Sequence, residues 1–274
     1  MVKTIEKKTF ISILIAVRNG EKTIEKCIES ILKQNYTSFE IVIVDDGSTD
    51  STKDIIKRIN SKKIKIYTNN GVKGQAGALN YGMKKCMGKY IFRIDADDEM
   101  LQHRIAIQIK EMDENPKITM SVGGRLVCYE NRVRLIEVKK LNYIKVSDLL
   151  FGNPIPHSTA TFRRESLEKN KLEYDTKYES AEDFDLWFKI AKLGIIKYVD
   201  QPLIKYHESL SQVSNTSRVR QATAAIRIKL KNIFDLENQV KTNVRTKAFI
   251  IVTFEVLALF YHYLKMNLSF IHER

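Results

Sequence analysis

The sequence predicts an α/β fold in which a mostly parallel β-sheet is flanked by helices on both faces. Three observations support this prediction. Short β-branched runs alternate with helical patterns through the first hundred residues. Several of these runs end in a turn rich in Asp, Asn or Gly. Hydrophobic residues make up 43% of the chain, as expected for a protein with a packed core.

Two strand–helix units open the chain. The run ISILIAV at 11–17 predicts a strand, and the isoleucines of 24–32 recur after it at helical spacing. The run EIVIV at 40–44 has no polar interruption after its first residue, which is typical of a parallel strand with both faces buried. A polar turn at 45–48 then leads to a second helix with apolar residues in 55–59.

Two further units follow. The run KIKIY at 63–67 predicts a third strand, and 75–87 predicts a helix whose inward side extends to Met87. The run YIFRID at 90–95 predicts a fourth strand. Sheets of this kind bind ligands beyond the carboxyl ends of their strands. The polar residues after each strand are therefore the first candidates for a functional site.

The pattern is less regular from residue 101 to 207. It predicts helices at 101–114, 146–151 and 179–193, a loop at 152–162, and strands at 118–127, 132–138, 195–199 and 202–207. We expect residues 1–100 and 101–214 to be the two halves of one domain.

Residues 215–274 form a predicted helical C-terminal extension, and ten Lys/Arg against four Asp/Glu give it a net charge of +6. Its apolar stretch at 247–264 is interrupted by Glu255 and His262, and it falls short of the roughly 20 clean apolar residues of a bilayer span. An interfacial or buried helix is therefore expected. Peripheral contact with an anionic membrane and contact with a second copy in a homodimer are the two alternatives for this segment.

The net charge of +13 favours an anionic partner, and a solvated lysine-rich surface is the alternative explanation. The basic residues are spread along the chain without an aromatic platform, so we expect no nucleic-acid partner. Three distant cysteines form neither a metal pair nor a disulfide framework, and residues 1–10 lack a signal-peptide pattern. We expect a cytoplasmic protein, which the membrane alternative would place at the cytoplasmic membrane face.

Asp95, Asp97 and Asp98 directly follow the apolar part of the fourth predicted strand. If the strand continues, Asp95 and Asp97 share one face. Carboxylates this close keep their charge when a cation neutralises them, and their oxygen ligands suit Mg²⁺ or Mn²⁺. Such an ion would bridge a diphosphate and take up charge on a leaving phosphate. A solvated acidic turn is the alternative.

A second acidic group, made of Glu182, Asp183 and Asp185, precedes an apolar helical stripe in ESAEDFDLWFKIAKLG at 179–194. Acidic residues near a helix N-terminus compensate the helix dipole, which is one explanation. The functional alternative is a general base that accepts a proton from an attacking hydroxyl.

Four motifs in this order resemble those of family 2 glycosyltransferases with the GT-A fold, a Rossmann-like α/β fold. They are SILIAVRNGEKTIEKCIESILKQNYTSFEIVIVDDGSTDST, NNGVKGQAGALNYGMKKCMGKYIFRIDADD, ESAEDFDLWFKIAKLG and IKYHESLSQVS. The resemblance covers about Ile11 to Ser214. It implies an inverting, metal-assisted hexosyltransferase of polysaccharide biosynthesis. The donor it implies is a nucleotide-sugar, with UDP-sugars as the first expectation, and the acceptor is a glycan or a lipid-linked saccharide.

The resemblance also implies roles for particular residues. Asp183 matches the catalytic base of the family. The residues expected to contact the nucleotide-sugar are Ala16, Val17, Arg18, Asp45, Asp46, Asp95, Ala96 and Asp97. The expected metal ligand is Asp97, and the further candidate ligands are Asp95, Asp98 and His207. The acceptor-side segment of the family resembles His157, Ser158 and Thr159, for which ordinary packing is the alternative.

The sequence departs from the family pattern at two places. Leu79 stands where many members carry an arginine, so Lys73 or Arg93 is the candidate to grip the nucleotide instead. The first strand ends in AVRN rather than the more common Pro-Val-Tyr-Asn, and neither change touches the acidic residues. A sugar nucleotidyltransferase is the rival enzyme class. It is disfavoured because AVRNGEK has one glycine and does not form a Gly/Arg/Lys-rich triphosphate loop.

Overall fold

The first half of the chain builds parallel strands from strand–helix units, as the sequence predicts. A computed structural model describes residues 8–129, 132–178, 180–208, 218–235 and 241–272, and the side chains of the last helix as far as Ala258. The elements of the first half are β1 (Ile11–Val17), α1 (Ile24–Leu32), β2 (Phe39–Asp45), α2 (Thr52–Arg58), β3 (Ile64–Thr68), α3 (Gln75–Met83) and β4 (Tyr90–Arg93).

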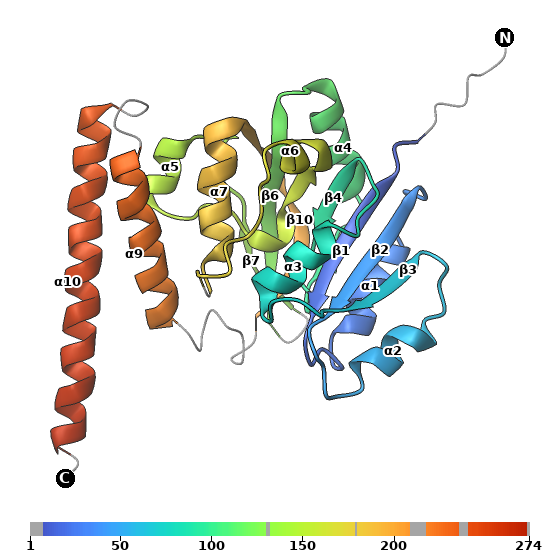
Figure 1. The fold of residues 1–274 in the computed structure, drawn as a ribbon, viewed down its shortest axis with the longest axis horizontal. Helices are drawn as coiled ribbons and strands as arrows, with labels where there is room; N and C mark the ends of the chain where they lie inside the picture. Colours follow the sequence, from blue (N-terminus) through green and yellow to red (C-terminus); the bar gives the residue numbers. More distant parts are fainter. Residues whose placement is uncertain (1–7, 130–131, 179, 209–217, 236–240, 273–274) are drawn as a thin grey trace.

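The second half adds shorter and more irregular elements (Figure 1). They are β5 (Glu99–Met100), α4 (Arg104–Glu114), β6 (Ile118–Tyr129), β7 (Arg132–Glu137), β8 (Tyr143–Ile144), α5 (Val146–Phe151), the 3₁₀ turn η1 (His157–Thr159), β9 (Thr161–Arg163), α6 (Arg164–Lys169), α7 (Glu182–Leu193) and β10 (Ile195–His207).

The strands join in one mixed sheet with the order β3-β2-β1-β4-β9-β6-β10-β5, and β7 and β8 pair with β6 and β10 at its side. Strands β1 to β4 are parallel, and the short strand β9 is antiparallel to both β4 and β6. Strand β6 therefore runs in the same direction as β4, and β10 is parallel to β6. The carboxyl ends of β1, β2, β4, β6 and β10 thus lie at one edge of the sheet, which is where such folds bind ligands.

Both faces of the sheet are covered, which explains the unbroken apolar strands. Alternate residues of β1 enter different cores: Ile13 and Ile15 pack on the side of α1 and α4, and Leu14 packs on the side of α3 and α7. Trp187 of α7 is completely buried in the second core. The two cores hold the carboxyl edge of the sheet rigidly between them.

Several predicted element boundaries were wrong, and two of these differences have a clear structural reason. Helix α3 ends at Met83, and Met87 is 65% exposed rather than inward. The chain must turn there because Gly88 passes so close to β1 that a Cβ on it would lie 2.3 Å from the backbone nitrogen of Ser12. The two strands predicted at 195–199 and 202–207 are one strand, β10, whose pairing with β6 is irregular around Pro202. Proline lacks the N–H that a regular ladder needs, so it disturbs the strand without ending it.

The C-terminal region forms a pair of helices, α9 (Arg218–Asp235) and α10 (Thr242–His272), which confirms the predicted helical extension. Helix α9 packs against α5 and α7, and α10 lies along the outer side of α9 (Figure 1). No described helix has the length and hydrophobicity needed to cross a bilayer. The domain boundary predicted after Ser214 lies outside the described residues and stays a prediction.

Candidate active site

The turn after β4 holds the carboxylate of Asp95 with donors from two elements. Arg93 is 1% exposed and directs both terminal guanidinium nitrogens at Asp95, with 2.6 Å between Nη1 and Oδ2. Gln75, the first residue of α3, donates from Nε2 to Oδ1 at 3.1 Å. The backbone N–H of Asp95 donates to the hydroxyl of Ser158 at 2.9 Å. A bidentate arginine pair fixes both the position and the plane of a carboxylate, so Asp95 is oriented before a ligand binds.

Asp98 is a buried carboxyl group without compensation by ordinary hydrogen bonds. It is 1% exposed, and neither oxygen has a hydrogen-bond partner of good geometry among the described residues. Burial, and then the charges of Asp95 and Asp97, raise the pKa of Asp98 well above its usual value, while the nearby Ser158 hydroxyl and Arg93 act in the opposite direction. A buried polar group left in this state commonly marks a site for an ion or a water molecule.

The three carboxylates of this turn converge. Asp95, Asp97 and Asp98 each offer one oxygen, and these oxygens lie within 4.8 Å of one another. Asp95 and Asp97 are partly exposed, so the cluster is accessible from solvent on one side. Hard divalent cations take several carboxylate oxygens as ligands, and a cation would neutralise the buried charge of Asp98. The residues present therefore fit Mg²⁺ or Mn²⁺.

His207 ends β10 at the same edge of the sheet, and its ring contacts a different carboxylate. Its Nε2 lies 2.6 Å from Oε1 of Glu99, which also contacts Nζ of Lys26 at 2.9 Å and, through Oε2, Nζ of Lys205 at 3.5 Å. Burial alone would raise the pKa of Glu99, but Lys26, His207 and Lys205 together hold it below its usual value. While Nε2 contacts Glu99, a metal ion would have to bind the other ring nitrogen, Nδ1, and the metal role of His207 stays a prediction.

Asp183 lies in the first turn of α7, where two donors hold its carboxylate. Oδ1 accepts the N–H of Phe184 at 2.7 Å, and Oδ2 accepts Nδ2 of Asn153 at 3.1 Å. Burial chiefly, together with the charge of Asp95, raises the pKa of Asp183, although Phe184, Arg93 and Asn153 all favour its ionised form. A carboxylate with a raised pKa accepts a proton more readily at neutral pH than an ordinary one.

Glu182 is the more deeply buried neighbour of Asp183, with 5% of its surface exposed. Burial, and then the charges of Asp183 and Asp95, raise the pKa of Glu182 to about 7, against the effect of Arg93. Compensation of the helix dipole needs ionised acids near the helix N-terminus, and it does not explain why two neighbouring acids have raised pKa values. The functional alternative for this group, a general base, stays a prediction.

Two buried arginines lie under the acidic groups. Arg93 contacts Asp95 directly, and its charge also favours the ionised forms of Asp98 and Asp183. Arg104 is fully buried and donates through Nη2 to the backbone oxygen of Arg93 at 2.8 Å. Burial, and then the charge of Arg93, lower the pKa of Arg104 to about 9. These cations reduce the repulsion that the acidic cluster would otherwise suffer.

Asp45, the last residue of β2, and Asp46, the residue after it, organise two turns at the same edge. Asp45 is fully buried and accepts the N–H groups of Gly47 and Ser48 and an ion pair from Lys53 at 3.1 Å. Burial alone would raise the pKa of Asp45, but the bonds from Ser48 and Lys53 outweigh it and lower the pKa. Asp45 therefore shapes the turn beside Asp46.

Asp46 connects β2 to the loop before α3. Its Oδ1 accepts Nδ2 of Asn69 at 2.7 Å, and its Oδ2 accepts the N–H of Gly74 at 2.8 Å. Lys73 in this loop donates to the backbone oxygen of Asn69 at 2.6 Å. Since Gln75 in turn contacts Asp95, residues 69–75 bridge Asp46 and the acid turn. The structure thus brings together acids that are about fifty residues apart in the sequence.

The remaining expected donor contacts lie around the end of β1. Ala16 is partly buried, Val17 is buried, and Arg18 is exposed. The backbone oxygen of Val17 accepts the N–H of Asp46 at 2.8 Å, so the ends of β1 and β2 are adjacent. Ala96 is partly buried against the core on the α1 side. All four lie at the carboxyl edge, and their contact with a nucleotide stays a prediction.

Sequence motifs did not reveal the residues that orient the acids. Gln75, Asn153 and Arg104 contact the site only because α3, the 152–162 loop and α4 fold onto it, and no spacing rule marks them. The expected acceptor-side segment is a 3₁₀ turn in which the ring of the partly buried His157 lies 2.8 Å from the hydroxyl of Tyr174. Burial, and then the charge of Arg93, lower the pKa of His157 well below its usual value.

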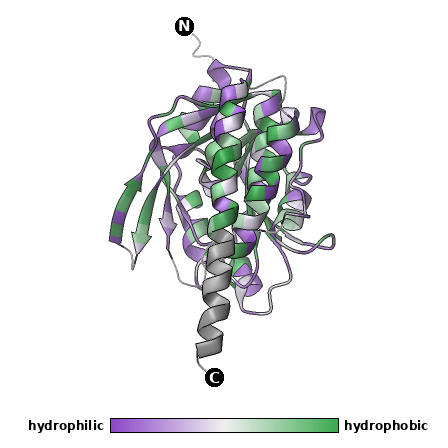
Figure 2. Cartoon of the chain, turned by 90° about the vertical axis from the view of Figure 1, so that its left-hand side faces the viewer, coloured by the Kyte–Doolittle hydropathy of each residue, from purple (hydrophilic) through white to green (hydrophobic). Residues whose placement is uncertain are grey.

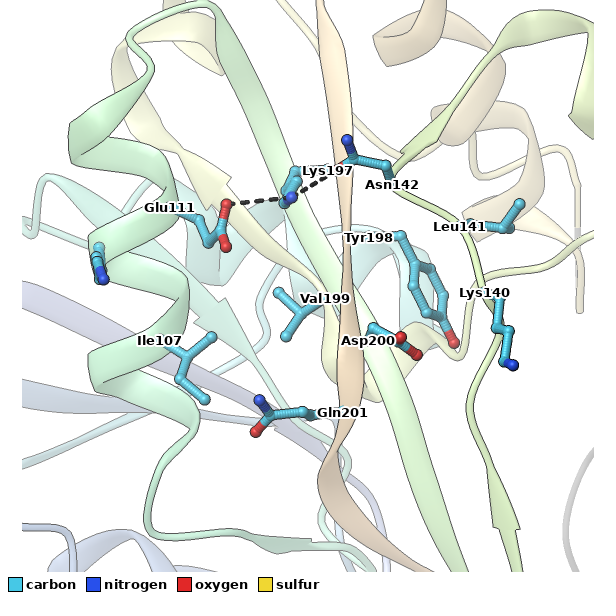
Figure 3. A pocket seen from close by; sticks show the side chains of 11 residues that line it. Ile107, Glu111, Lys140, Leu141, Asn142, Lys197, Tyr198, Val199, Asp200 and Gln201 are labelled. Atoms are coloured by element: carbon cyan, nitrogen blue, oxygen red, sulfur yellow. Dashed lines mark hydrogen bonds and ion pairs between the residues drawn. The ribbon is translucent and has the colours of Figure 1, made fainter.

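A separate cavity lies away from the acids, between α4, β10 and the segment before β8 (Figure 3). Lys197 projects into it and contacts Glu111 at 3.3 Å and Oδ1 of Asn142 at 2.6 Å. None of the predicted site residues lines this cavity. The carboxyl edge of the sheet, rather than this hollow, carries the groups capable of chemistry.

Comparison with known sequences shows the family of the chain. The sequence model of Glycosyl transferase family 2 matches residues 12–171. The chain is 31% identical over 209 residues to the Escherichia coli protein named UDP-Glc:alpha-D-GlcNAc-diphosphoundecaprenol beta-1,3-glucosyltransferase WfgD. This alignment covers 75% of this chain and 79% of WfgD. The chain is 35% identical over 187 residues to WfaP of the same species, whose name gives the same activity, with 68% and 71% covered.

Solved structures share the fold. S. aureus TarS residues 1–349, determined with UDP-GlcNAc, superposes with a TM-score of 0.71 at 18% identity, covering 90% of this chain and 72% of that one. The mannosyltransferase PcManGT from Pyrobaculum calidifontis, determined with GDP-Man and Mn²⁺, gives 0.58 at 18% identity, with 94% and 84% covered. At these identities the likeness shows the fold alone, and it confirms the predicted GT-A architecture.

Proposed function

The chain belongs to glycosyl transferase family 2, and from this premise we propose that it transfers a sugar from a UDP-sugar to a hydroxyl of a lipid-linked saccharide, with inversion at the anomeric carbon. The observation that carries the proposal is the convergence of two acidic groups at one edge of the sheet. The acid turn suits a metal and a diphosphate, and Asp183 with its raised pKa suits a base.

The acid turn would hold the donor. Asp97 and Asp98 are the proposed ligands of Mn²⁺ or Mg²⁺, with Asp95 held beside them by Arg93. The bound ion would offset negative charge on the diphosphate that leaves. Asp46, supported by Asn69 and Gly74, would face the base of the nucleotide, and Asp45 would hold the turn in place. The UDP-sugar named for WfgD and the UDP-GlcNAc bound to TarS support the choice of nucleotide.

Asp183 would act as the base in a single displacement. An acceptor hydroxyl gives its proton to the Asp183 carboxylate, and the acceptor oxygen forms a bond to the anomeric carbon. The bond from that carbon to the diphosphate oxygen breaks with its electron pair, and the nucleoside diphosphate leaves. One inversion needs no covalent intermediate on the enzyme. The hydrogen bond from Asn153 would hold the Asp183 carboxylate in one orientation.

The test is transfer by purified protein and an Asp183→Asn variant, with a panel of UDP-, GDP- and dTDP-sugars, Mn²⁺ and a lipid-linked acceptor. We expect the variant to bind the preferred donor with wild-type affinity and to lose at least about 100-fold in transfer rate, as removal of a general base predicts. Asp185→Asn is the matched control, because Asp185 lies in the same turn but pairs with Lys189 at 2.6 Å. Wild-type turnover by Asp183→Asn would refute the assigned base, and the absence of turnover with every donor would refute the proposed reaction.

A further inference from the structure

Helix α10 exposes an unusual number of large apolar side chains. Phe249, Ile250, Ile251, Phe254, Val256 and Leu257 are between 36% and 66% exposed, and together they form what we term the outer face. Figure 2 looks onto this face and shows the middle of α10 as hydrophobic below a hydrophilic first turn. A contiguous exposed apolar surface on a folded protein commonly marks an interaction site.

The outer face is exposed because the opposite side of α10 is anchored. Ala248 and Val252 are buried, and Nζ of Lys229 in α9 contacts Oε1 of Glu255 at 2.6 Å. Nε of Arg245 donates to the backbone oxygen of Ile233 at 3.1 Å. A surface helix with one buried stripe normally places polar residues on its other side. Here the other side is apolar as well, so one more contact is required to bury it.

The charge around the outer face points to the nature of that contact. Lys247 of α10 and Lys241, which directly precedes α10, are exposed basic residues on the α10 side of this helical pair. The acidic residues among its described side chains are Asp235 and Glu255, and both are ion-paired. The surroundings of the apolar face are therefore positive, which complements the phosphates of an acidic lipid headgroup region.

Lys247 shows how charge and apolar surface are combined. It lies three, four and seven residues before Ile250, Ile251 and Phe254, so all four lie in one stripe. Lysine in such a position keeps its ammonium group in the headgroup layer while its aliphatic part and its neighbours enter the acyl region. A two-fold contact with a second copy would instead bring the same positive surroundings together.

We propose that the outer face of α10 lies flat in the surface of an anionic phospholipid bilayer, with Lys241 and Lys247 in contact with lipid phosphates. The helix enters the interface without crossing the bilayer, consistent with the lack of a bilayer-spanning helix among the described residues. This contact would hold the enzyme at the membrane surface where a lipid-linked acceptor is presented, and to that extent it rests on the proposed transfer reaction. It does not depend on the identity of the donor.

The test is flotation of full-length protein with vesicles that contain neither donor nor acceptor. One set is phosphatidylcholine alone, and the other contains about 30% phosphatidylglycerol, a content that gives a marked negative surface potential. We expect recovery with the anionic vesicles only, and we expect it to fall when the salt concentration rises from about 0.1 M to about 0.5 M. Lys241→Gln with Lys247→Gln should lower partitioning by about fivefold for each charge.

Variants distinguish vesicle binding through the outer face from nonspecific adsorption of exposed apolar side chains. Ile250→Glu with Phe254→Glu should reduce vesicle recovery at least tenfold. The matched control is Leu135→Glu with Ile136→Glu on β7, where the side chains are 53% and 61% exposed, and it should float like the wild type. Equal recovery of the outer-face variant and the wild type, or no recovery of the wild type, would overturn the proposal. A fall from dimer to monomer in sedimentation of the outer-face variant without lipid would assign the face to a second copy instead.

Failure of the membrane contact and failure of the transfer reaction give different results. UDP release from the donor in vesicle-free buffer should be the same for the outer-face variant and the wild type. Protein that floats but turns over no donor would refute the reaction and leave the contact intact. Protein that turns over donor but does not float would refute the contact alone.

Discussion

Arg93→Met should destabilise the protein strongly, because it leaves Asp95 and its acidic neighbours without their buried cation. Arg93 is 1% exposed, and its Nη1 lies 2.6 Å from Oδ2 of Asp95. Opposite charges about 4 Å apart attract by roughly 4 kcal/mol at an effective dielectric constant of about 20. Removing one partner of a buried pair costs about 3–5 kcal/mol in the free energy of unfolding. Because the Asp95 side chain is 29% exposed, we expect the lower end of that range.

The assay is a double-mutant cycle by urea and thermal unfolding. A loss of about 3 kcal/mol should lower the midpoint of thermal unfolding by roughly 6–12 °C. Arg93→Met combined with Asp95→Asn should recover part of the loss, with a coupling energy of about 2 kcal/mol. Lys33→Met removes one charge from the exposed pair with Glu29 and should cost under about 0.5 kcal/mol. Strict additivity of Arg93→Met and Asp95→Asn would refute the claim that the two side chains act as a pair.

Two further predictions concern the chemistry of the acids. Asn153→Leu removes a hydrogen bond that favours ionised Asp183, so the pKa of Asp183 rises and the acidic limb of kcat/KM moves to higher pH by up to about one pH unit. An unchanged pH profile would contradict the positioning role of Asn153. Asp98→Asn should raise the unfolding midpoint in metal-free buffer at pH 7. Because the folded pKa of Asp98 lies above its unfolded value, its contribution to stability is full below the unfolded pKa and is lost as pH rises toward the folded pKa. Mn²⁺ should stabilise the wild type and have little effect on Asp98→Asn, as followed by thermal unfolding, and equal stabilisation of both would contradict the metal site.

The strands and helices of the first half could be predicted from sequence because each carries a local pattern. Apolar runs such as Ile41 to Val44 are long enough to exclude solvated alternatives, and the structure places all four residues in the core. The end of α3 could not be predicted, since it depends on how closely Gly88 approaches Ser12 in another strand. That 195–207 forms one continuous strand, β10, likewise depends on pairing with β6, which is about eighty residues away in the sequence.

The acids themselves were visible in the sequence, and their supports were not. Asp95, Asp97, Asp98 and Asp183 stand at predicted element ends, where side chains reach a ligand. The residues that hold them are uncharged or buried, as with Gln75 and Asn153, and their types occur anywhere in a protein. Only the tertiary contacts distinguish them from ordinary surface amides.

The sequence by itself determined the order of strands and helices, the family of the chain, and which carboxylates end the strands, because hydrophobic period and short motifs are local properties. The tertiary structure decided how those carboxylates ionise and what holds them, because a pKa depends on burial and on charges that arrive from distant segments. It also decided that α10 turns an apolar face outward, since the helix is apolar on several sides and its contact with α9 selects the side that is buried.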